Sequence, residues 1–369
     1  MTESKRRRVF SCAEEDRISN LQEHLLDSIL ERVPIEDAAR TSILSRKWRH
    51  TWRNMRALVF DKHFSNKFAK NGAFRRNIPP DSFQEVDQWM YFLSRNGVTE
   101  IILTNSNQLY KLPCYMFCCR ELRKLKLKHC LFKPPLEFKA FLNLEDLELT
   151  NIDFGDNLCG SQISLPQLKT LSLSSVRKLR GSYITIFGIH DFVGGDRKDL
   201  SKELSHLPEI KDVHIDSIFR KCLFAENIPK WLPHPVISLK RLRLQFFQVG
   251  DLDQLHGALC LLRNSPNVEQ LYLKLEPRVD EGPALNHLKS SNCLDCTLNQ
   301  LQTVEITDLQ GSRPEMLFIE LLLAHSPSLH KFTIKPSRVS NVKNRLFITI
   351  DVMRFSRASP KAKLLFVNS

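Results

Sequence analysis

The sequence at residues 122–127 reads LRKLKL, and this L-x-x-L-x-L pattern of apolar residues returns along the rest of the chain. Clear copies begin at residues 122, 144, 168, 239, 268, 301 and 329, and two looser copies begin at residues 98 and 210. The steps between copies are 22 or 24 residues up to residue 168 and 28–33 residues from residue 210 onward. This spacing indicates a chain built from repeated structural units.

The end of each copy, L-x-L, has the alternation of a β-strand, so its two apolar side chains point to one face and the residue between them points to the other. One strand cannot bury its apolar face alone. Units stacked as a parallel sheet share one core and leave the alternate side chains on a concave face about 40 Å long. The pattern therefore predicts an α/β solenoid, an irregular leucine-rich-repeat array with a parallel sheet.

The longer steps leave room for helices on the convex side, and the apolar segments 252–262 and 316–324 suit that role. In the shorter steps we expect loops or single 3₁₀ turns. The 42-residue step between positions 168 and 210 contains Gly188, Gly194 and Gly195 and the charged run 196–199, which predicts a poorly matching repeat and an exposed loop. A helical pattern at residues 81–92 predicts a cap on the array.

The composition is that of a folded protein without a membrane span. The chain has 369 residues with 55 Leu, 42% hydrophobic residues and 26% charged residues, which excludes global disorder. No apolar run approaches the roughly 18 residues of a spanning helix. The N-terminus is polar and lacks the apolar segment of a secretory signal, so we expect the nucleus and/or the cytoplasm. The ten Cys are then expected to be reduced thiols.

Residues 16–56 follow a different, helical pattern. The first helix has apolar residues at helical spacing, with Ser19 or Asn20 as its expected N-cap, and Pro34 ends it. Second and third short helices are expected at 35–43 and 44–52. Three helices in about 40 residues make a core too small to stand alone, so this module is expected to need a partner or a neighbouring domain.

This N-terminal segment resembles the F-box of plant F-box/leucine-rich-repeat proteins. The resemblance rests on DRIS at 16–19, LLDSIL at 25–30, DAARTS at 37–42 and LSRKWR at 44–49. It implies a module that binds the Skp-type adaptor of a cullin-RING ubiquitin ligase, with the target bound by the repeats. The family usually has Pro where this chain has Gln22, which would lower adaptor affinity. The adaptor-binding residues expected from it are Leu21, Leu25, Leu26, Ile29, Leu30, Pro34 and Trp48, although some of these must instead form the module's own core.

The C-terminal part is similar to the FBD region of the same proteins. The similarity lies in Cys296, LQTVEI at 301–306, Gly311, the helical pattern at 315–328 and LHKFTI at 329–334. The expected organisation is a basic disordered tail at 1–15, an F-box at 16–57, a linker and N-terminal cap of the repeats at 58–97, leucine-rich repeats at 98–295 and an FBD region at 296–369 that continues the array.

Two other functions stay open beside that of a substrate-recognition subunit of an SCF-type ligase. One is an F-box receptor whose repeats bind a small molecule, which a deep pocket walled by repeat loops would favour. The other is nucleic-acid binding, because the net charge is +13 and residues 331–369 hold nine basic residues against Asp351. It is less favoured, since the sequence shows no nucleic-acid-binding module.

Chemistry within the chain itself is not expected. Cys293 and Cys296 form a lone C-x-x-C without two further ligands at zinc spacing, so loop or core thiols are preferred over a metal or redox site. No nucleophile elbow, P-loop, nucleotide fingerprint or H-E-x-x-H motif is present. We therefore predict a non-catalytic protein that needs no cofactor or metal and has no membrane partner.

Overall fold

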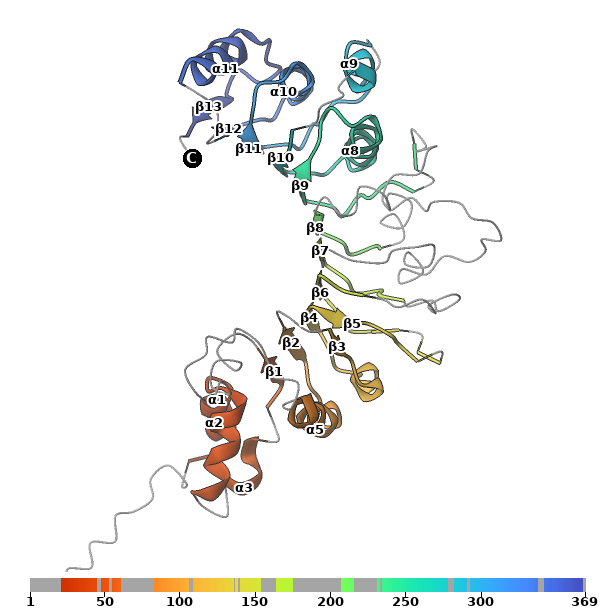
Figure 1. The fold of residues 1–369 in the computed structure, drawn as a ribbon, viewed down its shortest axis with the longest axis vertical. Helices are drawn as coiled ribbons and strands as arrows, with labels where there is room; N and C mark the ends of the chain where they lie inside the picture. The colour runs from red at the N-terminus through yellow and green to blue at the C-terminus, as the bar shows by residue number, and fades with distance from the viewer. Residues whose placement is uncertain are drawn as a thin grey trace, which may run out of the picture.

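The structure is a computed structural model. It describes residues 21–44, 48–52, 55–60, 83–105, 109–135, 137–138, 140–153, 164–174, 207–215, 231–232, 234–277, 282–290, 293–337 and 342–367. These residues form an arc of strands with helices along its outer side, and a group of short helices lies beyond the first strand (Figure 1). The expected basic tail at 1–15 and most of the loop expected between 168 and 210 lie outside the described residues.

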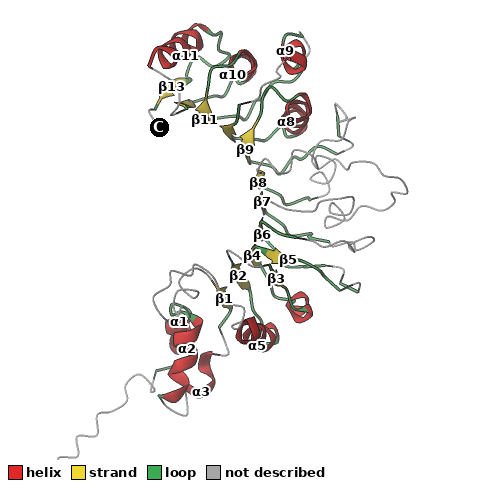
Figure 2. Ribbon diagram, in the orientation of Figure 1, coloured by secondary structure: helices red, strands yellow, loops and turns green. Residues whose placement is uncertain are grey.

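The arc is an eleven-stranded sheet in which every neighbouring pair is parallel. Its strands, in order, are β1 (Ala57–Phe60), β2 (Glu100–Thr104), β4 (Lys124–Lys128), β6 (Asp146–Thr150), β7 (Thr170–Ser174), β8 (Asp212–Ile215), β9 (Arg241–Phe247), β10 (Gln270–Leu275), β11 (Thr303–Leu309), β12 (Lys331–Pro336) and β13 (Lys363–Phe366). A second, two-stranded sheet pairs β3 (Tyr110–Lys111) with β5 (Cys130–Leu131) on the outer side (Figure 2).

The register of the sheet follows the repeat. Leu125 on β4 pairs with Leu147 on β6, which pairs with Leu171 on β7, so equivalent leucines form rows across the strands. These leucines are buried, and the residues between them are partly exposed. The parallel repeat array predicted from L-x-x-L-x-L is therefore confirmed.

Each of the nine predicted copies forms a strand, and the sheet is longer by one strand at each end. β1 lies at the boundary between the segments expected to be F-box and linker, and β13 forms the last edge. Neither strand contains the L-x-x-L-x-L pattern: β1 reads ALVF and β13 reads KLLF. The apolar rows continue into these strands, since Leu58 pairs with Ile101 and Leu364 pairs with Phe332, but the full spacing of leucines is missing and the pattern did not find them.

The outer layer contains the helices that the sequence predicted and two more. The layer contains α5 (Phe83–Ser94), the 3₁₀ helix η4 (Cys114–Cys118), α8 (Leu252–Asn264), α9 (Gly282–Leu288), α10 (Arg313–His325) and α11 (Val342–Arg354). The side chain of Asp251 caps α8, and a capping box of Ser312 and Glu315 starts α10. α9 and α11 were not predicted.

No helix in the described part of the chain is long and apolar enough to span a bilayer.

The N-terminal group consists of α1 (Glu23–Leu30), α2 (Ile35–Arg40), the 3₁₀ helix η1 (Thr41–Ile43) and α3 (Trp48–Thr51). The expected second helix, 35–43, is thus an α-helix followed by a 3₁₀ turn. The expected N-cap was wrong, since α1 begins at Glu23 with Gln22 in the N-cap position, and the side chain of Gln22 forms no cap hydrogen bond.

Candidate functional site

An exposed apolar face lies on α1. The side chains of Leu25 and Ile29 are 42% and 44% exposed. They are four residues apart and therefore lie on one side of the helix. Leu26 and Leu30, one position further along, are almost fully buried, so α1 presents one apolar face to its own module and an adjoining one to solvent. Pro34, which follows α1, is also exposed.

The structure divides the seven expected adaptor-binding residues into two groups. Leu25, Ile29 and Pro34 are accessible to a partner. Leu26, Leu30 and Trp48 are at most 5% exposed because they form the core between α1 and α3. Leu21 is partly buried and packs against that core. Some of the seven were expected to form the module's own core, and the structure gives that place to Leu26, Leu30 and Trp48, so these three are removed from the expected docking surface.

Two accessible residues were missed by the sequence reading. Ile43 and Leu44 are 87% and 68% exposed at the end of η1. Apolar side chains this exposed on so small a module are a signal of an interaction surface. The helical pattern placed them only at the end of the second and the start of the third expected helix, because it does not show which apolar positions the neighbouring helices cover.

The backbone at Gln22 has the shape of the proline usual in the family. Its φ is −65° and its ψ is 148°, and the pyrrolidine ring fixes φ near −65°. Its carbonyl accepts hydrogen bonds from the N–H groups of Leu25 and Leu26 at 3.0 and 3.2 Å, which starts α1. The replacement of Pro by Gln therefore leaves a proline-like geometry at the start of the helix.

The concave face of the sheet is a second candidate surface. A groove of about 540 Å³ runs over β6, β7, β8 and β9. The lining side chains that point out of the sheet are mostly hydroxyl-bearing or charged: Glu148, Thr150, Thr170, Ser172, Ser174, Asp212, His214, Arg241 and Arg243. The Oγ of Ser172 lies 3.2 Å from Nδ1 of His214 on the next strand. A small-molecule receptor would need a deep pocket walled by repeat loops, and the loop segments 175–206 and 216–230 lie outside the described residues.

Ion pairs between neighbouring strands neutralise part of this face. Lys126 lies 2.6 Å from Glu148, and Lys335 lies 2.6 Å from Glu305. At the start of β6 and β7, a hydrogen bond from Lys169 lowers the pKa of Glu145. Exposed pairs of this kind contribute at most about 1 kcal/mol each to stability. Their clearer effect is on the charge that the face presents to a partner.

The charge of the concave face differs between its two halves. The outward positions of β2 to β8 carry three lysines (Lys124, Lys126, Lys128) and four acids (Glu100, Asp146, Glu148, Asp212). The outward positions of β9 to β13 carry six basic residues and two acids, namely Arg241, Arg243, Lys274, Lys331, Lys335, Lys363, Glu305 and Asp308. The C-terminal half is therefore basic.

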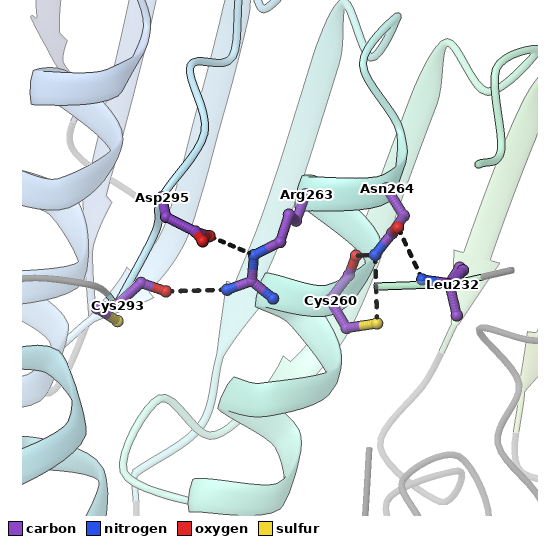
Figure 3. Close-up of polar contacts among 6 residues, drawn as sticks. All are labelled: Leu232, Cys260, Arg263, Asn264, Cys293 and Asp295. Atoms are coloured by element: carbon purple, nitrogen blue, oxygen red, sulfur yellow. Dashed lines mark hydrogen bonds and ion pairs between the residues drawn. The ribbon is translucent and has the colours of Figure 1, made fainter. Parts of the chain in front are cut away.

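The end of α8 shows that the C-x-x-C segment is structural. Arg263, whose side chain is 7% exposed, lies 2.8 Å from the Asp295 carboxylate and donates to the Cys293 carbonyl at 3.1 Å (Figure 3). The neighbouring Asn264 accepts from the Leu232 N–H at 2.9 Å and donates to the Cys260 carbonyl at 2.8 Å. These two side chains fasten the loops on both sides of α8 to its C-terminal end.

The thiols of this segment are not activated. Burial raises the pKa of Cys293 to about 11, although the nearby Arg263 opposes the shift, and burial also raises the pKa of Cys296. Both cysteines are free. Within the described residues, no group of three or more His, Cys, Asp or Glu side chains is arranged to hold a metal ion.

Known proteins match this arrangement of an N-terminal helical module and a repeat array. Family models match at residues 18–59 (F-box domain), 70–184 (the At1g61320/AtMIF1, LRR domain) and 289–334 (FBD). An F-box/FBD/LRR-repeat protein of Arabidopsis thaliana is 31% identical, over 95% of this chain and 98% of its own length. This chain belongs to the plant F-box/FBD/leucine-rich-repeat family.

More distant members of the F-box/FBD/leucine-rich-repeat family are similar over the same extent. A putative FBD-associated F-box protein of Arabidopsis thaliana is 23% identical over 88% of this chain and 98% of its own length. A further F-box/FBD/LRR-repeat protein of that plant is 22% identical over 95% and 99%. The family resemblance inferred from the sequence is confirmed, and the exposed faces of α1 and η1 lie within the F-box match.

Proposed function

We propose that this chain is the substrate-recognition subunit of an SCF-type ubiquitin ligase, acting in the nucleus and/or the cytoplasm. In this proposal the three helices α1, α2 and α3 form the F-box that binds a Skp-type adaptor. The concave face of the repeats binds a target protein. The observation that carries the proposal is the exposed apolar face of the F-box, at Leu25, Ile29, Ile43 and Leu44.

Burial of this face would supply the free energy of adaptor binding. Fully burying an aliphatic side chain of this size contributes roughly 1.5–3 kcal/mol. Four aliphatic side chains that are 42–87% exposed on a small module offer apolar contacts of the kind found in the centre of stable interfaces. Pro34 would add a rigid apolar contact at the edge of this centre.

The target would bind with an acidic segment over the C-terminal half of the concave face. Six basic side chains against two acids on the outward positions of β9 to β13 attract negative charge and repel basic partners. The groove over β6 to β9 lies next to this half and offers hydroxyl groups for hydrogen bonds. Such a surface selects a target by charge and by polar contacts.

The contribution to ubiquitin transfer would be one of proximity. A chain that binds the adaptor with one module and the target with another converts the meeting of target lysine and conjugating enzyme into an intramolecular event. No bond chemistry by this chain is needed. Cullin and RING subunits would join through the adaptor.

Copurification with a Skp-type adaptor tests this function. Leu25→Asp with Ile29→Asp places two charges on the exposed face of α1 and leaves its buried face intact. We expect loss of adaptor copurification with an unchanged circular dichroism spectrum. Leu142→Asp is the control, because this side chain is 63% exposed on the repeat array, away from the F-box.

Adaptor binding that survives both substitutions on α1 would reject the proposed docking face. Leu26→Asp distinguishes docking from folding, since it buries a charge in the core of the module and should unfold it. A loss of binding by Leu26→Asp alone would therefore support only the structural role of that residue.

A further inference from the structure

The exposed large apolar side chains gather at the two ends of the described chain. Fifteen are exposed in the described residues, and four of them belong to the F-box. Six more lie in the last helix and strand or just after: Leu346, Phe347, Ile350, Met353, Leu365 and Val367. The proposed adaptor accounts for the first group. It does not account for the second.

The helix α11 has two apolar faces. Ile348 and Val352 are buried and Phe355, just after the helix, packs against the core, so this face points inward. Leu346, Ile350 and Met353 are 59%, 37% and 57% exposed. Their spacing of four and three residues places them in one row on the opposite side of the helix. We call this row, together with the adjoining Phe347, the α11 stripe.

The α11 stripe faces away from the other helices of the outer layer. α8, α9, α10 and α11 follow one another along the arc and contact in sequence (Figure 1). Asn344 donates to the Gln310 carbonyl at 2.8 Å, and Ile348 lies against Gly311, so this side of α11 faces the start of α10. At 100° per residue, Leu346 and Met353 lie on the opposite side. Each earlier helix in the row has a following helix beside it, whereas the described residues place none beyond α11.

Two basic side chains and one acid lie beside the α11 stripe. Lys343 and Arg354 are exposed, and at four and seven residues from Phe347 they flank it on the same side of the helix. Lys343 Nζ lies 6.0 Å from the centre of the Phe347 ring. The exposed Asp351, four residues after Phe347, lies on that side too, and it is the one acid among residues 331–369, which hold nine Lys or Arg. A partner that covers the stripe must therefore meet a basic rim.

We propose that the α11 stripe docks an amphipathic helix of a partner protein, with apolar residues on one side and acidic residues along its flanks. The row of Leu346, Ile350 and Met353 has the i, i+4, i+7 spacing that interdigitates with a second helix. The occupant would continue the helix row beyond α11. A second copy of this chain would bring its own basic rim against this one, and such like-charge contacts are unfavourable.

The test uses the full chain and two designed helical peptides labelled with a fluorophore. Both have leucine at i, i+4 and i+7, with glutamate on the flanks in one and lysine in the other. We expect fluorescence anisotropy to show at least about tenfold tighter binding of the glutamate peptide. Leu346→Ser with Ile350→Ser should weaken it about tenfold or more, and Lys343→Glu with Arg354→Glu should reverse the preference between the peptides. Leu142→Ser, another exposed position, should change neither affinity.

Each other outcome overturns the proposal. Equal binding of the two peptides, or none, removes the acidic helix as occupant. Self-association in analytical ultracentrifugation that Leu346→Ser abolishes would assign the stripe to a second copy. Cosedimentation with phosphatidylserine vesicles that the same substitution abolishes would assign it to a lipid surface. Adaptor copurification should be unchanged in all these variants, which separates this test from that of the F-box.

Discussion

Gly311 lies against Ile348, so close that a Cβ built on Gly311 would be 2.7 Å from Cγ1 and 2.9 Å from Cδ1 of the isoleucine. Gly311 precedes α10 and has a φ of +83°, and Ile348 is a buried residue of α11. The contact therefore joins the last two helices of the outer layer at a position where only glycine fits without a shift. Gly311 lies within the FBD match, residues 289–334, and Ile348 of α11 lies beyond its end.

Gly311→Ala should lower the free energy of unfolding by about 2–4 kcal/mol, because alanine at positive φ is strained and its methyl group overpacks the site. Urea denaturation measures the change. Gly97→Ala is the matched control: Gly97 has a φ of +69° but no atom within 4 Å of the built Cβ. It should cost only the backbone part, about 1 kcal/mol. Equal costs at both positions would contradict the contact with Ile348.

The ion pair of Arg263 should matter more than an exposed one. Arg263→Ala removes a nearly buried guanidinium that holds Asp295 and the Cys293 carbonyl, and we expect a loss of about 2–3 kcal/mol in urea denaturation. Arg40→Ala is the control, since Arg40 is 73% exposed beside Asp37 and should cost about 0.5 kcal/mol or less. A small, equal cost for both would show that the fastening of the loop to α8 does not depend on Arg263.

Two histidines between α8 and α9 predict a loss of stability on acidification. His256 Nε2 lies 3.4 Å from His287 Nδ1. Burial lowers the pKa of both histidines. At His256, Asp253 opposes this shift and Arg263 adds to it, and at His287 both His256 and Arg263 add to it. Below a pH of about 6.5 the unfolded chain therefore binds protons that the folded chain does not. This part of the stability is present above that pH and is lost as the pH falls toward the lowered folded pKa values.

Urea denaturation at several pH values between about 7.5 and 5.5 measures this loss. The slope in that window cannot exceed about 1.4 kcal/mol per pH unit for each histidine. In His287→Gln the free energy of unfolding should fall less steeply as the pH falls. The substitution removes one titrating group and also the charge that opposes protonation of His256. Parallel curves for the variant and the natural chain would show that the pair does not contribute.

The strands were predictable because each repeat copy specifies its own strand and the register of its neighbour. Leu125, Leu147 and Leu171 are buried by the same rule and pair across the sheet. β1 and β13, at the two edges, continue the same rows through Leu58 and Leu364, but they lack the full six-residue pattern of leucines. α11 was missed because its apolar residues point both inward, as Ile348 does, and outward, as Leu346 does, so no one-sided pattern exists.

The exposed apolar face of α1, proposed above as the docking face, was predictable only in part. Leu25 with Ile29 and Leu26 with Leu30 are both pairs of aliphatic residues four apart, and spacing alone ranks them equally. The burial of the second pair depends on Trp48, which α3 brings against α1. This contact between separate helices is tertiary, and a helical period contains no information on it. The exposure of Ile43 and Leu44 has the same origin.

Gln22→Pro should stabilise the F-box and strengthen its binding to the proposed adaptor. The φ of Gln22, −65°, is already that of proline, so the ring restricts the unfolded chain without straining the folded one. We expect the free energy of unfolding to rise by about 0.4–1 kcal/mol in urea denaturation. Asp27→Pro, in the middle of α1, should instead cost about 3 kcal/mol or more, because proline there clashes with the preceding turn and removes a helical hydrogen bond. Destabilisation of the module by Gln22→Pro would contradict the proline-like backbone conformation at the start of α1. Stabilisation without tighter adaptor binding would show that the start of α1 does not belong to the docking surface.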